Sequence, residues 1–188
     1  SLASMRNTSR NTLREVFRML AKDGLVKHAP NRGVFVVIPS IASIIDIYRV
    51  RRLIECQALA QAYPRHPAKK KMREAVDRAK ACRDGGDWLG VGTANMAFHM
   101  AVVELADSER LNLLFGSVLA ELRLAFGLLR DAEFLHAPYV EMNENILALA
   151  EAGEFARAAA ALNDYLVHSE RIVLAVYARH INDSGWSV

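Results

Sequence analysis

Three arginines recur at four-residue intervals near the start of the chain, Arg10, Arg14 and Arg18. Residues four apart lie on the same face of an α-helix. A guanidinium group suits phosphate oxygens and the O6 and N7 atoms of guanine, and an amide such as that of Asn11 suits adenine. This spacing therefore predicts a helix face that could contact nucleic acid.

The residues around these arginines predict a helix with defined ends. Ser9 follows Thr8 and is a suitable N-cap, because its hydroxyl can accept a hydrogen bond from the first turn. Gly24 follows Lys22 and Asp23 and suits a C-terminal stop. A second, apolar face has helical spacing and consists of Leu13, Val16, Phe17 and Leu20.

Two short strands are expected after this helix, over residues 25–27 and 34–38, with a turn at residues 30–33. A capped helix followed by a two-stranded ribbon with a basic tip is the order of a winged helix-turn-helix. Such a fold places the start of the helix in the major groove of DNA, and Arg32 would contact the DNA backbone or minor groove. The predicted DNA contacts are Arg6, Thr8, Ser9, Arg10, Asn11, Thr12, Arg14 and Arg32.

The alternative for the arginines is a solvated face of an ordinary surface helix. The charge distribution argues against it. Residues 1–39 hold seven Lys and Arg and two acidic residues, a net charge of +5, whereas the whole chain carries +3, which leaves −2 for residues 40–188. The positive charge is therefore concentrated in a small head, residues 1–39, as expected of a DNA-binding domain.

The head also resembles the GntR family of bacterial transcription regulators. The resemblance rests on the pattern Ser-Arg-x-x-Leu-Arg-Glu-x-Phe-x-x-Leu-x-x-x-Gly-Leu-Val over residues 9–26, followed by Arg-Gly-x-Phe-Val over residues 32–36. Residues 48–55 resemble the start of the FadR-type effector (FCD) domain. In the family another helix precedes Ser1, so the chain as given is expected to open inside the second helix, with Leu2, Ala3 and Met5 as its apolar residues.

After Pro39 the sequence predicts helices at residues 40–63, 68–84, 87–106, 108–130, 137–152 and 154–181. Ser40, Asp87 and Ser108 are the expected N-caps. Six amphipathic helices with short loops predict an antiparallel bundle, and the resemblance implies the six-helix, VanR-like form of the effector domain. The expected fold is therefore mostly α, with a head at 1–39, an effector-binding and dimerisation domain at 40–182, and a tail at 183–188.

The resemblance implies an internal pocket that often holds a divalent metal. Its ligands in the family are an Asp and a His four residues apart, with two further His from later helices. The corresponding positions here hold Asn95, His99, Asn143 and Tyr165. Amides are weak ligands for transition metals, and a tyrosine stays protonated near neutral pH. We therefore predict no metal and no cofactor, with His99, His168 and His136 as the fallback ligands of a rebuilt metal site.

These four residues and Arg51 could still line a pocket for a polar effector, with Arg51 pairing with an effector carboxylate. The alternative is a closed network of core residues that bond to one another. The chain would then be a metal-free helical module that binds a ligand or only dimerises, without ligand-gated switching.

An enzyme is not expected. His99, Tyr165, Asp164 and Cys82 are not placed as a nucleophile, a base and an orienting group. The chain has no Gly-rich phosphate loop and no HExxH or CxxC pairing.

Composition suits a soluble regulator. Although 52% of the residues are hydrophobic, no run reaches the ~18 consecutive apolar residues of a membrane-spanning helix. The only two cysteines, Cys56 and Cys82, suggest no disulfide, so a cytoplasmic location is expected. The prediction is an effector-responsive homodimer that binds double-stranded operator DNA.

Overall fold

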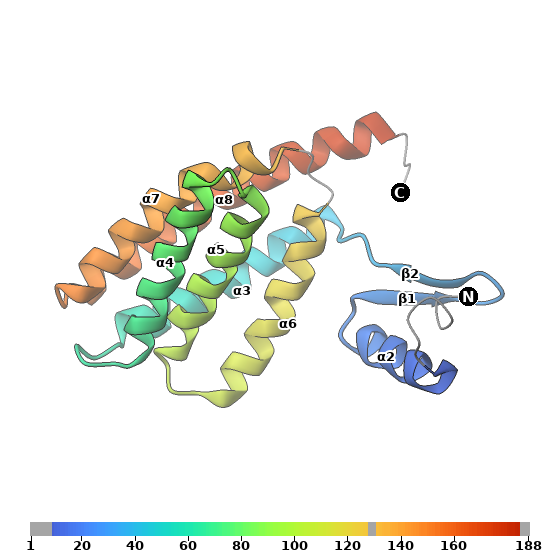
Figure 1. Ribbon diagram of the computed structural model, residues 1–188, viewed down its shortest axis with the longest axis horizontal. Coiled ribbons are helices and arrows are strands. Elements are labelled where there is room, and N and C mark those ends of the chain that lie inside the picture. The colour runs from blue at the N-terminus through green and yellow to red at the C-terminus, as the bar shows by residue number, and fades with distance from the viewer. Residues whose placement is uncertain (1–8, 128–130, 185–188) are drawn as a thin grey trace. The chain divides into compact units, whose positions relative to one another are not determined.

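The computed structural model of the chain describes residues 9–127 and 131–184, with the exception of the side chains of Arg10 and of residues 179–184. The chain divides into two compact units, Ser1–Pro39 and Ser40–Val188 (Figure 1). A mostly helical chain with one small two-stranded sheet confirms the predicted fold class. The expected helical residues before Ser9 lie outside the described residues.

In the first unit, helix α2 spans Arg10–Lys22 and begins and ends where the sequence predicts. The Ser9 hydroxyl accepts a hydrogen bond from the backbone N–H of Thr12 at 3.0 Å. At the other end, Gly24 adopts a left-handed conformation, with φ of 72°, which glycine adopts without strain. The N–H groups of Gly24 and Leu25 then bond to carbonyls of the last turn, so the helix ends in a Schellman motif.

Strands β1 (Val26–Ala29) and β2 (Gly33–Val36) form an antiparallel hairpin in which Val26 pairs with Val36 and Ala29 with Gly33. Asn31 and Gly33 have positive φ angles in the turn, and the N–H of Arg32 bonds to the carbonyl of Ala29. The predicted strands were displaced by one or two residues, because the turn is tight enough for Ala29 and Gly33 to join the ladder.

The second unit contains six helices within its described residues. They are α3 (Ile41–Ala60), α4 (Ala68–Asp84), α5 (Trp88–Glu104), α6 (Glu109–Phe126), α7 (Ala132–Glu151) and α8 (Phe155–Ser184). The predicted N-caps are confirmed: Ser40, Asp87 and Ser108 each accept a hydrogen bond from a backbone N–H in the first turn of the helix that follows.

Four helix boundaries differ from the prediction by three or more residues. Helix α3 ends at Ala60 and not at residue 63, and α6 ends at Phe126 and not at residue 130. Helix α7 begins at Ala132 and not at residue 137, because Asp131 caps it by accepting a bond from the N–H of Phe134. Pro138 was predicted to lie between helices but lies inside α7. Helix α8 continues to Ser184, so residues 183 and 184 of the predicted tail are helical.

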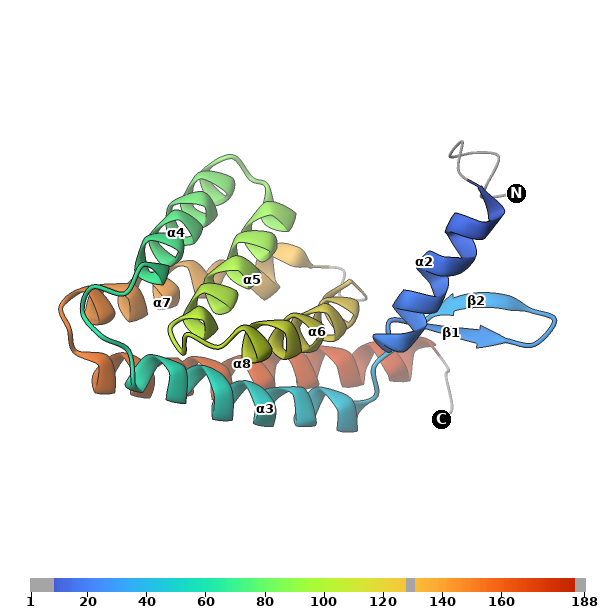
Figure 2. The same cartoon turned by 90° about the horizontal axis from the view of Figure 1, so that it is seen from below.

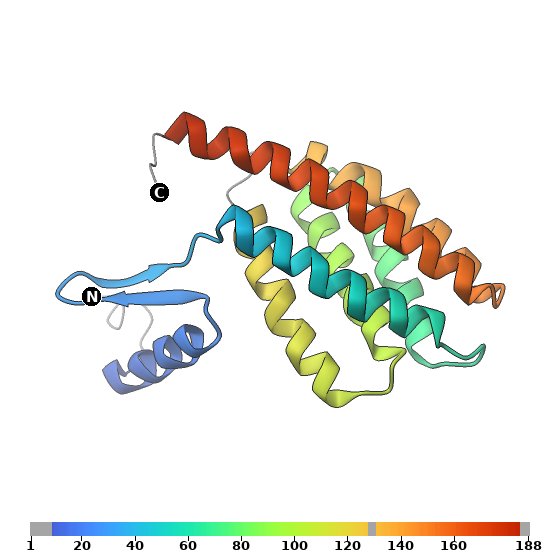
Figure 3. The ribbon, with the colours of Figure 1, turned by 180° about the vertical axis from the view of Figure 1, so that it is seen from behind.

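Helices α3 and α8 lie side by side and antiparallel (Figure 3). Helices α4, α5 and α6 lie on one side of this pair (Figure 2). Helix α5 packs against α3, α4, α6 and α7, and its buried residues cover most of its circumference. A helix of this kind belongs in the core, and α5 therefore carries both Asn95 and His99 into the bundle. No helix in the described ranges is long and apolar enough to span a membrane.

The seam between α3 and α8 contains a buried hydrogen bond, 2.7 Å long, between the hydroxyls of Tyr48 and Ser169. We expect Ser169→Ala to lower the free energy of unfolding by about 1–3 kcal/mol, because it deprives the buried Tyr48 hydroxyl of this partner. Urea unfolding followed by circular dichroism measures the change. Ser117→Ala on the exposed face of α6 is the control and should stay within about 0.5 kcal/mol of the parent. Equal effects of the two substitutions would contradict a role for the bond.

Candidate effector site and DNA-binding surface

The start of α2 exposes polar side chains around its cap. The hydroxyls of Ser9 and Thr12 form a hydrogen bond to each other at 2.8 Å, and this bond stabilises the first turn of the helix. Asn11 and Arg14 are exposed on the first turns. Among the side chains that the structure describes, Arg14 has no hydrogen-bond or ion-pair partner, whereas Arg18 pairs with Glu15 at 2.8 Å. Of the two arginines of this helix whose side chains are described, Arg14 is therefore the one that is free to bind an anion.

The structure describes the side chain of only one of the four remaining residues that were predicted to contact DNA. Arg32 is exposed in the turn of the β1–β2 hairpin of the same unit. Arg6 and Thr8 lie outside the described residues, as does the side chain of Arg10.

In the helical unit, a buried ion network joins α3 to α5. The Nε of Arg51 donates to Oε1 of Glu55 at 2.7 Å, and Nδ1 of His99 lies 2.5 Å from Oε2 of the same carboxylate. Glu55 and His99 are fully buried, and Arg51 is 2% exposed. Glu55 was not among the residues predicted for the site, although its i,i+4 spacing from Arg51 was a usable signal.

The charges in this network follow from its contacts. Burial alone would raise the pKa of Glu55, but Arg51 and His99 outweigh it and lower that pKa, so the carboxyl is ionised. Burial lowers the pKa of His99, so its imidazole is neutral. A neutral His99 that donates from Nδ1 to Glu55 keeps Nε2 as a hydrogen-bond acceptor.

A second group of bonds joins α5, α7 and α8. The amide Oδ1 of Asn95 accepts from Nδ2 of Asn143 at 2.6 Å and from the Tyr165 hydroxyl at 3.1 Å. Burial holds the pKa of Tyr165 well above its usual value, so the phenol is protonated. The Tyr165 ring also lies 4.9 Å, centroid to centroid, from the ring of His99. Asn95, His99, Asn143 and Tyr165, the four residues predicted to occupy the family's metal-ligand positions, therefore meet in one polar cluster, together with Arg51 and Glu55.

Three atoms of this polar cluster are buried without a hydrogen-bond partner: Nη2 of Arg51, Nε2 of His99 and Oδ1 of Asn143. Buried polar atoms are nearly always paired in folded proteins. The cluster thus offers one donor and two acceptors to a further polar group.

The cluster does not fit a transition metal. Nδ1 of His99 is used by Glu55, the Arg51 cation lies beside it, and the remaining positions are amides and a protonated phenol. Within the described residues, no three His, Cys, Asp or Glu side chains are grouped to hold an ion. The fallback histidines do not converge: His168 is exposed near Tyr139, and His136 packs against Phe126.

We expect the buried network of Arg51, Glu55 and His99 to contribute measurably to the free energy of unfolding. Glu55→Gln keeps the shape of the side chain but leaves the Arg51 charge buried without its carboxylate. We expect a loss of roughly 3–5 kcal/mol in the free energy of unfolding, measured by urea titration. The control is Glu151→Gln, which removes a carboxylate of the half-exposed ion pair with Arg73 and should cost less than about 1 kcal/mol. The network assignment fails if the two variants are equally stable.

The chain resembles known proteins both in sequence and in fold. The family model of the FCD domain matches residues 46–168. A solved structure of a GntR transcriptional regulator from Rhodococcus sp. RHA1 is 38% identical, covers 94% of this chain and 85% of its own, and superposes with a TM-score of 0.90. No curated protein matches this chain.

More distant structures share the fold alone. The E. coli protein McbR/YncC is 18% identical, with 94% of this chain and 85% of that chain covered and a TM-score of 0.81. A GntR family member from Pseudomonas syringae pv. tomato str. DC3000 is 21% identical, with 95% and 76% covered and a TM-score of 0.56. The relatives are transcription regulators and not enzymes, in line with the sequence-based expectation. This chain belongs to the GntR family of transcriptional regulators, in the group that carries an FCD effector domain.

Proposed function

We propose that this protein binds double-stranded operator DNA as a homodimer and that a small effector bound in its helical unit changes its affinity for DNA. The observation that carries the proposal is the unpaired, exposed Arg14 at the start of a capped helix, in a unit with a net charge of +5. Backbone N–H groups at a helix start also favour phosphate. Asn11 and Arg14 would contact base edges, and Arg32 would contact the backbone or minor groove.

Homodimerisation follows from the size of the DNA-binding element. A single recognition helix reads only a half-site of a few base pairs. Two copies related by a two-fold axis read both halves of a palindromic operator, and two-fold dimers are the commonest protein oligomers. The sequence-based contacts Arg6, Thr8 and Arg10 would belong to the same half-site interface.

The effector site we propose is the polar cluster around His99. Its three unpaired atoms require a ligand, or water, that accepts from Arg51 and donates to His99 and Asn143. The charge of Arg51 is already balanced by Glu55, so a neutral polar group suits the cluster better than the carboxylate expected from the sequence. Helices α3, α5, α7 and α8 all contribute to the cluster, and a ligand bound there would shift the populations of their arrangements.

A closed core network remains the competing proposal for the same residues. All six polar side chains of the cluster already form hydrogen bonds within it: Asn143 and Tyr165 donate to Asn95, and Arg51 and His99 bond to Glu55. In that case the helical unit would serve dimerisation, and no ligand would switch DNA binding. Ordered water would then form the missing hydrogen bonds to the three unpaired atoms.

The DNA-binding proposal predicts the behaviour of Arg14→Ala. Using duplexes selected from a random pool by the parent protein, we expect binding weaker by about 1–3 kcal/mol, roughly 5- to 150-fold, measured by fluorescence anisotropy. The matched control is Arg110→Ala, an exposed arginine on α6, which should bind like the parent. A folded Arg14→Ala protein with unchanged affinity at several salt concentrations would remove α2 from the interface.

The location of the effector cluster predicts the outcome of a rebuilt metal site. Combining Asn95→Asp, Asn143→His and Tyr165→His should create stoichiometric zinc binding, because Asn143 and Tyr165 both hydrogen-bond to Asn95 and the Tyr165 ring lies beside His99. Elemental analysis and zinc titration of the variant measure it, and the parent protein should bind none. The control adds His99→Ala, which should weaken binding. A folded triple variant without zinc would show that the four side chains do not face a common centre.

A further inference from the structure

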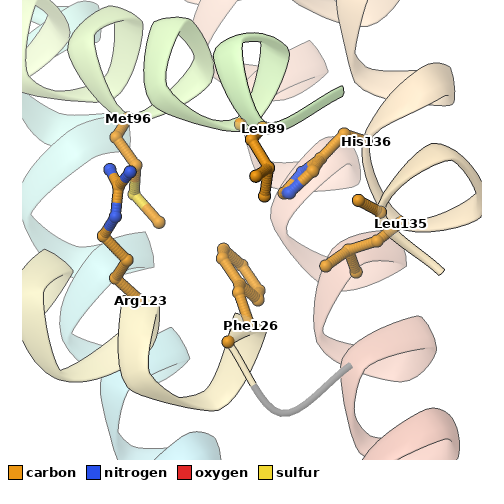
Figure 4. A pocket seen from close by; sticks show the side chains of 9 residues that line it. Leu89, Met96, Arg123, Phe126, Leu135 and His136 are labelled. Carbon is orange, nitrogen blue, oxygen red and sulfur yellow. The ribbon is translucent and has the colours of Figure 1, made fainter. Parts of the chain in front are cut away.

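A cavity of about 200 Å³ lies between α5, α6 and α7. Six side chains form most of its wall: Leu89, Met96, Arg123, Phe126, Leu135 and His136. Figure 4 shows Arg123 and Met96 on one side of the view, His136 and Leu135 on the other, and Leu89 and Phe126 between them. No residue of the polar cluster lines this cavity, so it is a separate feature of the helical unit.

Arg123 supplies a positioned cation at this cavity. Its Nη2 donates to the Thr93 hydroxyl at 2.9 Å, and that hydroxyl donates in turn to the carbonyl of Leu89 at 3.0 Å. The two bonds fix the direction of the guanidinium group. Among the described side chains, no carboxylate forms an ion pair with Arg123. Most of its five N–H donors therefore remain available to an anion.

His136 supplies a neutral polar group on the other wall. A Cβ at position 92 would come within 2.6 Å of Nε2, so Gly92 makes room for the imidazole. The Phe126 ring meets the imidazole edge-on, with 5.6 Å between ring centroids. Burial, aided by the charge of Arg123, lowers the pKa of His136 to about 4. Neither ring nitrogen has a hydrogen-bond partner in the described part of the chain, so one donor and one acceptor are left for a ligand.

The remaining walls are apolar and limit the size of an occupant. Leu89 is 76% exposed and places the mouth of the cavity at the surface, whereas Leu135 is buried. Pockets for drug-sized ligands measure about 300–1,000 Å³, so this cavity suits a smaller molecule. A single cation beside apolar walls matches one carboxylate on a compact apolar body, whereas a phosphate dianion would need more donors.

We propose that this cavity is a second small-molecule site, which takes a compact monocarboxylate with an aromatic or branched apolar body. The carboxylate binds the guanidinium of Arg123, and the body packs against Leu89, Met96 and Phe126. Neutral His136 bonds to any hydroxyl that the ligand carries. The proposal is independent of DNA binding and of the polar cluster.

Isothermal titration of the full chain with benzoate tests the ligand class without any DNA. We expect saturable binding with one benzoate per chain, retained in Arg110→Gln and at least about tenfold weaker in Arg123→Gln. Benzyl alcohol, which keeps the ring but lacks the charge, should bind the parent protein more weakly than benzoate. The proposal is overturned if benzoate does not saturate, if Arg123→Gln binds it equally well, or if benzyl alcohol binds as tightly.

Methionine-methyl NMR tests the location. Benzoate should shift the signal of Met96, which lines the cavity, and leave that of Met19 on α2 unchanged. Met96→Leu assigns the signal. Saturable binding that shifts other methionines but not Met96 would place the benzoate elsewhere and overturn the site. An intact response in a protein that fails to bind DNA would leave this site standing while removing the proposed function.

Discussion

The helical unit depends on one buried carboxylate. Glu55 is fully inaccessible to solvent, and an ionised carboxylate in such a place costs several kcal/mol unless opposite charge and hydrogen bonds compensate it. The guanidinium of Arg51 and the Nδ1–H of His99 provide that compensation. Because Glu55 lies on α3 and His99 on α5, the hydrogen bond between them fixes the register of the two helices.

The same interaction explains why the cluster suits polar groups and not a metal ion. A metal ligand set needs lone pairs and negative charge directed at one point. Here the imidazole is oriented by Glu55, a permanent cation lies beside it, and Asn95 already accepts two hydrogen bonds through its only side-chain oxygen. Two amides and a phenol stand where the resemblance implies metal ligands, and the charges around His99 also disfavour a metal ion. The contribution of Arg51 and Glu55 to this electrostatic effect could not be predicted from the ligand positions alone.

Local signals in the sequence were sufficient to predict where most helices begin. A hydroxyl or carboxylate at Ser40, Asp87 or Ser108 acts within one turn, so its effect can be predicted without the fold. Helix α7 was misjudged because Pro138 was given more weight than the cap at Asp131. The prediction that Asn95, Asn143 and Tyr165 lie close together rested on the family resemblance, because no sequence periodicity relates residues on three different helices. The cavity beside Arg123 could not be predicted, because it depends on how His136 packs over Gly92.

Helix α5 gives the polar cluster and the cavity a common element. Asn95 and His99 bond within the cluster, while Gly92 and Met96, on an adjacent face of the same helix, border the cavity. Consecutive residues of a helix point about 100° apart, so a small rotation of α5 that improves contacts on one face alters those on the other. A ligand that rotates α5 on binding to one site would therefore change the affinity of the other site, and linkage of binding free energies is reciprocal. The polar cluster is connected to the head, residues 1–39, through the chain itself. Helix α3 carries Arg51 and Glu55, and it begins directly after Ser40, at the boundary of the two units.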